Sequence, residues 1–204
     1  ISFLLVIYYN SNFVLVFSML VIIMNRLGDL MMLVMLMLFL NLLMNLNLIL
    51  YINLMEINFL FITMMLKSSQ FPLNLWLPKA MIAPLPISSL VHSSTLVTVG
   101  VYFMFRFFMF LNLNLILIIL LLSLIMFSLK MIWVNDLKKL MALSTMNNLS
   151  LMMFFMYMYL YMYMYMYMLI HALFKSMMFL CIGMFIFNNY DIQDVRFLGL
   201  MYIF

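Results

Sequence analysis

Charged residues are scarce in this sequence, and their scarcity decides its broad class. Only 7% of the 204 residues are Asp, Glu, Lys or Arg, while 71% are apolar. A soluble domain carries about 25% charged and 45–50% apolar residues, so this chain has too little polar surface for a water-soluble globule. Because one spanning helix needs about 20 mostly apolar residues, the length predicts about six full spans and a partial one.

Cysteine is nearly absent, and basic clusters and glycine-rich loops are missing. The single cysteine, Cys181, excludes a disulfide framework, a CxxC redox motif and a cysteine-ligated iron–sulfur cluster within this chain. The nine Lys and Arg residues are scattered, without the basic patches that bind nucleic acid. No metal-ligand set or phosphate-binding glycine loop is evident. We therefore expect no cofactor in this chain, no nucleic-acid partner, and a lipid bilayer around it.

The apolar runs predict helices rather than a β-barrel. Segments such as Phe13–Met24 and Leu113–Met126 are apolar on all sides, whereas barrel strands alternate apolar and polar residues. We expect an all-α fold, a polytopic transmembrane helix bundle in which residues 1–204 form one domain. Ile1 lies in an apolar stretch with no basic segment before it, so we expect the sequence to be a piece of a longer protein.

Polar interruptions divide the chain into expected helices. The ranges are 1–9, from 13 to about 44, a run ending at Lys67, about 87–108, 113–130, 136–156 and 157–187. The YMYMYMYM segment, Tyr161–Met168, has the two-residue period of a strand. A lone strand in lipid would leave its backbone unpaired, so we expect a helix there. Its codons would be a plain TA repeat if ATA encodes Met, as in animal mitochondria; chance enrichment in Met is the alternative.

Proline is confined to one region of the chain. All four prolines lie within residues 72–86, directly after Lys67. Proline removes a backbone donor and clashes with the preceding turn, which predicts a broken helix near Lys67–Pro78. Irregular backbone at membrane depth is tolerated only against protein or a wet cavity. We therefore expect Lys67 near the middle of the membrane, facing protein or water.

Four ionisable side chains fall inside apolar spans: Lys67, His92, His171 and Lys175. Such residues are costly in lipid and indicate function by default, and both residue types can transfer protons. The structural alternatives are a snorkelling Lys67 at a helix end and a His92 held by the neighbouring hydroxyls of residues 88–95. We expect His92 to face Lys67 from the next span.

His171 and Lys175 are four residues apart and therefore share one helical face. A cation pair facing lipid would have no compensating partner, so we expect this face to point toward the span at 136–156 and its Lys138. The alternative is a purely structural pair.

Other charges have simpler interpretations. Arg26 and Asp29 are spaced to pair on one helix, and Asp136 is placed to cap a helix or to serve as an acid at its first turn. Lys139 is most simply a solvated residue at a helix start.

Several motifs follow one another along the chain. They are NRLGD (25–29), KSSQFPLNLWLPKAMIAPLPISSLVHSSTLVTVGVYFMFRF (67–107), NDLKKLMALSTMNNLSLMM (135–153), HALFKSMMFLC (171–181) and QDVRFLG (193–199). The set resembles the subunit 5 family of mitochondrial NADH:ubiquinone oxidoreductase (complex I), which is antiporter-like.

The resemblance implies a chain of protonatable groups through the middle of the membrane, made of Lys67, His92, Lys138 and Lys175 with His171 beside it. It implies a proton-translocating subunit of NADH:ubiquinone reductase in the mitochondrial inner membrane, with other membrane-arm subunits of complex I as partners. NADH, FMN, iron–sulfur clusters and ubiquinone would be used elsewhere in that complex. Protons would be the sole small substrate handled by this chain.

The chain departs from the family pattern in three places. The acidic partner of Lys67 would precede Ile1, a further broken helix with a lysine would follow Phe204, and Tyr167 stands where many relatives have a second histidine. We therefore expect these residues alone to form an incomplete proton path. The main rival is an Mrp-type cation/proton antiporter subunit. A third alternative, a structural anchor, predicts that Leu can replace the buried lysines without effect.

Overall fold

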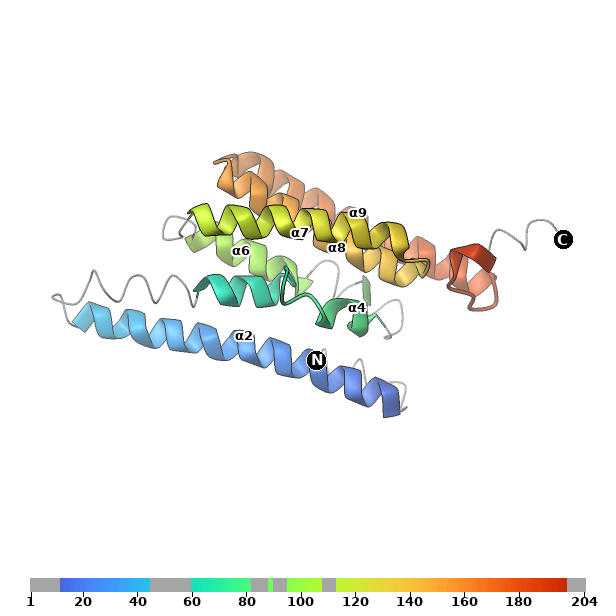
Figure 1. The fold of residues 1–204 in the computed structure, drawn as a ribbon, viewed down its shortest axis with the longest axis horizontal. Coiled ribbons are helices and arrows are strands. Elements are labelled where there is room, and N and C mark those ends of the chain that lie inside the picture. The colour runs from blue at the N-terminus through green and yellow to red at the C-terminus, as the bar shows by residue number, and fades with distance from the viewer. Residues whose placement is uncertain (1–11, 45–59, 82–87, 90–94, 108–112, 198–204) are drawn as a thin grey trace.

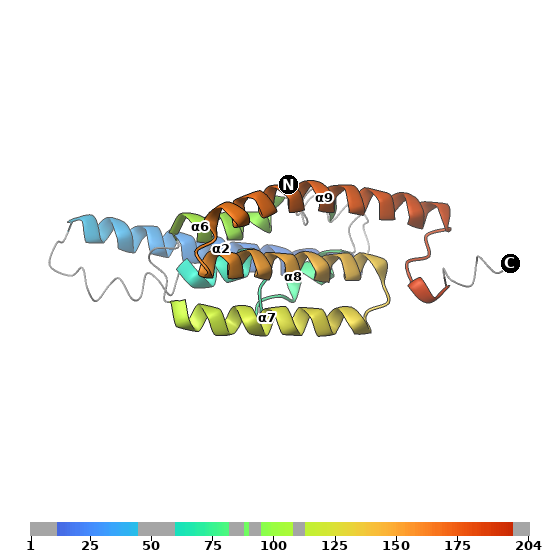
Figure 2. The same ribbon diagram turned by 90° about the horizontal axis from the view of Figure 1, so that it is seen from above.

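A computed structural model describes residues 12–44, 60–81, 88–89, 95–107 and 113–197, and these form helices and connecting turns with no β-strand. The long helices lie side by side along one axis (Figures 1 and 2). The labelled helices are α2 (Asn12–Met44), α4 (Trp76–Ala80), α6 (Thr98–Phe107), α7 (Leu113–Trp133), α8 (Leu137–Tyr157) and α9 (Tyr161–Asn188). A further helical segment covers residues 60–67. The expected all-α bundle is confirmed.

Three of these helices are long and apolar enough to cross a membrane. They contain the segments Leu15–Met37, Ile116–Trp133 and Tyr161–Asn188. Many of their large exposed side chains, such as Ile23, Ile132 and Phe174, are apolar, which suits a surface in contact with lipid or with other membrane helices. The tyrosine–methionine alternation at the start of α9 is helical, as expected, because a helix satisfies its own backbone in lipid.

The most polar long helix, α8, occupies the centre of the bundle. It packs against α4, α6, α7 and α9, and Figure 2 shows it between α7 and α9. Ten of its side chains are buried. Thr145 and Ser150 donate their hydroxyls to backbone carbonyls of the same helix, each at 2.7 Å. The α8 sequence can be this polar inside a membrane bundle because its neighbours cover it.

The helix over residues 60–67 ends at Lys67, where the prolines predict a break. The Phe71–Pro72 peptide bond is cis, and the chain becomes helical again only at Trp76. Met64 O keeps its regular helical donor, Ser68 N (2.9 Å), while the carbonyls freed by the break find new donors. Gln70 N donates to Met65 O (3.0 Å), and Trp76 Nε1 donates to Leu66 O (3.1 Å). The break is therefore a hydrogen-bonded structure built by the residues that follow Lys67.

Two expectations need adjustment. Asp136 occupies the N-cap position of α8, as expected, but its side chain makes no cap hydrogen bond. The carboxylate pairs with Lys139 instead, since an ammonium is a stronger partner than a backbone N–H. The span expected over 87–108 is described only in part, with α6 covering Thr98–Phe107.

Gly100 of α6 packs directly on the broken segment. A Cβ atom on Gly100 would lie 2.6 Å from Ser68 N and 2.9 Å from Ser68 Cβ. A Cβ on Gly28 of α2 would lie 3.6 Å from its nearest neighbour, Lys67 Cγ. A side chain at Gly100 would therefore clash with the Ser68 backbone, which is already held by a hydrogen bond. A side chain at Gly28 would make only an ordinary van der Waals contact.

We therefore predict that Gly100→Ala destabilises the subunit by about 1–3 kcal/mol, the usual cost of overpacking. Gly28→Ala is the matched control, because it makes the same helical Gly-to-Ala change without the clash. The measurement is the midpoint of heat denaturation of the full-length subunit in detergent. Equal midpoints for the two variants would contradict this packing.

Candidate functional site

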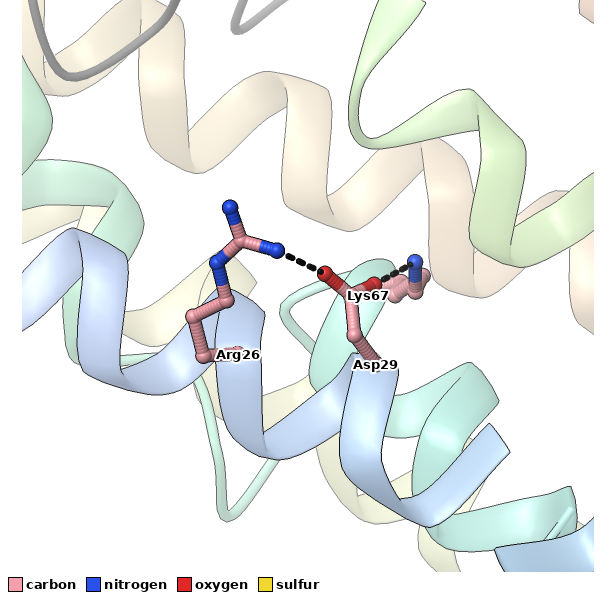
Figure 3. A network of polar contacts seen from close by, with 3 residues as sticks. All are labelled: Arg26, Asp29 and Lys67. Carbon is pink, nitrogen blue, oxygen red and sulfur yellow. Dashed lines mark hydrogen bonds and ion pairs between the residues drawn. The ribbon is translucent and has the colours of Figure 1, made fainter. Parts of the chain in front are cut away.

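Lys67 donates a hydrogen bond to the carboxylate of Asp29 (Figure 3). Lys67 Nζ lies 2.7 Å from Asp29 Oδ1, and Arg26 Nη1 lies 3.6 Å from Asp29 Oδ2. The side chains of Lys67, Asp29 and Arg26 are 22%, 41% and 76% exposed, respectively. The Lys67 contact is therefore the shorter and better covered of the two, so it contributes more to the bundle than the exposed Arg26 pair.

The two helices that carry this pair approach each other at a glycine. Gly28 precedes Asp29 on α2 and is buried against Lys67 and Leu66. Lys67 is the last residue of its helix, where a cation also interacts favourably with the partial negative charge of the helix terminus. Both features allow the Lys67 ammonium to reach Asp29 across a gap of 38 residues in sequence.

One sequence expectation about Lys67 is incomplete. The resemblance assigned its acidic partner to residues before Ile1, whereas Asp29 provides a carboxylate partner within the chain. Arg26 and Asp29 do pair as predicted from their spacing. The sequence could have indicated Asp29 as a partner for a lysine. It is the sole acidic residue of the 12–44 helix, and a carboxylate in an apolar span needs a cation.

The second group of ionisable side chains lies between α8 and α9. His171 and Lys175 are 4% and 9% exposed, and Lys175 Nζ donates to Ser144 Oγ of α8 at 2.5 Å. The predicted direction of this face, toward the span at 136–156, is confirmed by that contact. The partner is Ser144, a residue that the sequence analysis did not identify as part of the site.

The buried stripe of α9 explains why these two polar residues face inward. Its buried members are Met164, His171, Lys175, Phe179 and Ile186, spaced by seven, four, four and seven residues. That spacing forms one stripe along a helix. The two ionisable groups occupy the centre of the stripe, where α8 covers them.

Lys138 lies apart from Ser144 and Lys175. Six residues separate Lys138 from Ser144 on α8, which corresponds to about 9 Å along the axis and about 120° around it. Lys138 is near enough to Asp191 to interact with it electrostatically. The predicted meeting of Lys175 with Lys138 therefore has no direct contact to support it, and any transfer between them would need an intermediate group.

The remaining predicted site residue, His92, and its expected approach to Lys67 lie outside the described residues. Gln70, in the break after Lys67, is fully buried, and its amide atoms have no hydrogen-bond partner in the described part of the chain. Within those same residues, no group of three or more His, Cys, Asp or Glu side chains is arranged to hold a metal ion.

A separate polar junction closes one end of the bundle. Residues 135–137, before α8, and 193–195, after α9, are joined by backbone hydrogen bonds, Leu137 N to Gln193 O and Val195 N to Asn135 O, each 3.1 Å. The junction lines a cavity of about 320 Å³. Hydrogen bonding from Lys139 lowers the pKa of the Asp136 carboxyl, and hydrogen bonding to Asp136 raises the pKa of Asp194. This cluster is compensated internally and lies outside the helical stripe with Lys175.

Sequence comparison places these features among known membrane proteins. Residues 1–203 match the family described as NADH:quinone oxidoreductase/Mrp antiporter, TM. NADH-ubiquinone oxidoreductase chain 5 of Mytilus edulis is 40% identical over 203 residues, which cover 96% of this chain and 36% of that protein. The corresponding protein of Apis mellifera ligustica is 39% identical over 212 residues, covering 100% and 38%. The chain thus spans little more than a third of the length of these curated relatives.

Two solved structures share the fold. One is the Mrp complex from Dietzia sp., with a TM-score of 0.80 at 21% identity, covering 92% of this chain and 23% of that chain. The other is the membrane-bound sulfane sulfur reductase, an archaeal respiratory membrane complex, with a TM-score of 0.75 at 21% identity, covering 96% and 44%. These likenesses establish an antiporter-like helix bundle.

The geometry at Asp29 predicts unequal effects for its two cationic neighbours. Lys67→Met removes the 2.7 Å hydrogen bond and should destabilise the full-length subunit by about 1–3 kcal/mol, as expected for a charge-assisted bond. Arg26→Met removes an exposed pair and should cost less than about 1 kcal/mol. Heat-denaturation midpoints in detergent measure both. A larger loss with Arg26→Met would contradict the assignment of Lys67 as the main partner of Asp29.

Proposed function

We propose, from the premise that this chain belongs to the NADH:quinone oxidoreductase/Mrp antiporter transmembrane family, that it is part of a proton-translocating subunit of respiratory complex I. In this proposal, NADH oxidation and ubiquinone reduction occur in other subunits, and their free energy drives protons through the membrane subunit. The chain's own contribution is a set of buried lysine and histidine side chains. The relatives at about 40% identity, named NADH-ubiquinone oxidoreductase chain 5, support complex I over an Mrp complex.

The observation that carries the proposal is the Lys175 ammonium buried against a neutral hydroxyl. Lys175 is 9% exposed and donates to Ser144 Oγ, with no salt bridge to it in the described residues. Its positive charge is therefore poorly compensated in an apolar bundle. A lysine held only for structure would gain from a carboxylate partner, as Lys67 has in Asp29. A lysine that must release and regain a proton needs both protonation states to be accessible.

The two lysine centres suit different steps of proton transfer. Asp29 stabilises the protonated form of Lys67, so this centre retains a proton until the ion pair is disturbed. The Ser144 hydroxyl accepts a hydrogen bond from Lys175 when the lysine is protonated, and it can donate one to the neutral amine after the proton has left. His171 lies one turn before Lys175 on the same face and can accept and donate a proton through its two ring nitrogens. Lys138 and His92 are further members of the proposed relay.

The chain would lie among other subunits of a large membrane complex. Its partners would be other membrane-arm subunits of complex I, bound on the apolar helix faces that this chain leaves uncovered. The location would be the mitochondrial inner membrane. NADH, FMN, iron–sulfur clusters and ubiquinone would be bound by the complex outside this chain.

The rival function, an Mrp-type cation/proton antiporter subunit, rests on the fold shared with the Mrp complex. The two assemblies differ in composition, since only complex I contains flavin and iron–sulfur subunits. We expect the full-length protein to migrate on native gels of mitochondrial membranes in a band with NADH dehydrogenase activity. Its recovery, by peptide mass spectrometry, solely in a complex without flavin would favour the antiporter.

The buried face of α9 generates a functional prediction. In the full-length subunit within its complex, Lys175→Ala should lower NADH-driven proton uptake by about tenfold or more, since positioned proton carriers contribute about 10²–10⁴ in rate. His171→Ala should lower it less, because the adjacent lysine remains. The measurement is proton uptake in sealed vesicles, normalised to assembled complex.

Lys139→Ala is the matched control for Lys175→Ala, since it removes the same charge from an exposed position paired with Asp136. We expect nearly unchanged uptake. Equal tolerance of all three substitutions would mean that this helix has a structural role.

A further inference from the structure

His171 is buried without a hydrogen-bond partner. It is 4% exposed, and neither Nδ1 nor Nε2 has a partner among the residues that the structure describes. On the facing helix, Oδ1 of Asn147 is likewise buried and unpaired. Buried polar atoms are nearly always satisfied by protein or ordered water, so both side chains require an explanation.

Two contacts determine the position of His171 along the axis of α8. Lys175 meets Ser144, and the rings of Tyr167 and Phe155 are 6.0 Å apart. His171 lies midway between Tyr167 and Lys175 on α9. The part of α8 opposite it therefore lies between Ser144 and Phe155, because α8 and α9 run in opposite directions through a short turn (Figure 2).

Within this part of α8, Asn147 is the residue with a free buried acceptor. Thr145 Oγ1 donates to Ala142 O and Ser150 Oγ donates to Asn147 O, each at 2.7 Å. Asn147 is three residues from Ser144, hence one turn along the side of α8 that faces α9. Interpolation between the two contacts puts His171 opposite residues 149–150 of α8, so Asn147 lies within one helical turn of it, about 4 Å along the axis. One bridging water can span such a separation.

We propose that Asn147 is a positioning residue for His171, linked to it by one bound water. A ring N–H of neutral His171 donates to the water oxygen, and the water donates to Asn147 Oδ1. One water with polar neighbours on two helices is the usual way in which such buried groups are satisfied. This inference rests on the proposed function, and it adds a residue that lies within the 135–153 motif but was not among the predicted site residues.

The consequence for chemistry is a fixed tautomer. When one ring nitrogen of His171 is held as the donor, the other remains an acceptor. That second nitrogen can then take a proton released from the neighbouring Lys175, directly or through water. Without Asn147 the ring could occupy either tautomer, and only one of them presents a free lone pair toward Lys175.

The test compares variants of the full-length subunit in the assembled complex by NADH-driven proton uptake per complex. Asn147→Leu, which keeps the approximate volume but removes the acceptor, should lower uptake about three- to tenfold, the range for losing one hydrogen bond. Asn147→Gln keeps the neutral amide acceptor oxygen and should lower it less. Asn148→Leu is the matched control, because no amide atom of Asn148 is buried without a partner among the described residues, and it should leave uptake nearly unchanged.

The order of proton uptake among the Asn147 variants shows whether Asn147 positions His171 or only fills space. If Asn147 only fills space, Leu should be tolerated at least as well as Gln, and that order would overturn the proposal. An equal loss with Asn148→Leu would also overturn it. If Asn147→Leu does not assemble, Asn147→Ala replaces it, with the same expected order relative to Gln.

Lys175→Ala in the same series distinguishes a failure of the proposed role of Asn147 from a failure of the proposed function. A loss with Lys175→Ala but none with Asn147→Leu contradicts the role of Asn147 alone. No loss with either variant contradicts the proposed function as well.

Discussion

The hydrogen bond between Lys67 and Asp29 is the contact on which the interrupted part of the bundle depends. Lys67 ends its helix at the point where the chain leaves regular structure, and the break would otherwise combine a cation with freed carbonyl groups in an apolar environment. Asp29 compensates the charge, while Gln70 and Trp76 bind the carbonyls. Because both costs are met locally, the bundle can carry irregular backbone among its helices.

Lys175, unlike Lys67, has no carboxylate partner among the described residues. Lys175 has a hydroxyl as its partner, and the residue one turn earlier is a histidine with unpaired nitrogens. A charged pair holds helices together, whereas a cation beside neutral groups costs free energy whenever it is protonated. The contrast separates a centre that retains a charge from a centre that can exchange one. A membrane subunit that moves protons requires both kinds of group.

Much of this architecture could be predicted from local patterns. Apolar runs fixed α7, α8 and α9 to within a few residues, the prolines marked the end of the helix at Lys67, and the four-residue spacing put His171 and Lys175 on one buried face. Each of these features depends on residues close together in sequence, where steric and periodic rules apply directly.

Contacts between distant segments could not be predicted in the same way. Asp29 and Lys67 are 38 residues apart, and Lys175 and Ser144 are 31 apart, so their pairing depends on which helices become neighbours. The clash that excludes a side chain at Gly100 is also tertiary. The cap bond expected at Asp136 is absent for a local reason, because the ammonium of Lys139, three residues further on, pairs with the carboxylate instead.

The central claim is that the buried lysines transfer protons rather than merely hold helices together. The most direct measurement is the number of protons taken up per NADH oxidised by sealed vesicles that contain the complex with Lys175→Gln in the full-length subunit. The account predicts an assembled complex with a clearly lower proton yield, because glutamine can hydrogen-bond Ser144 but cannot carry a proton. An unchanged proton yield in the assembled complex would contradict it.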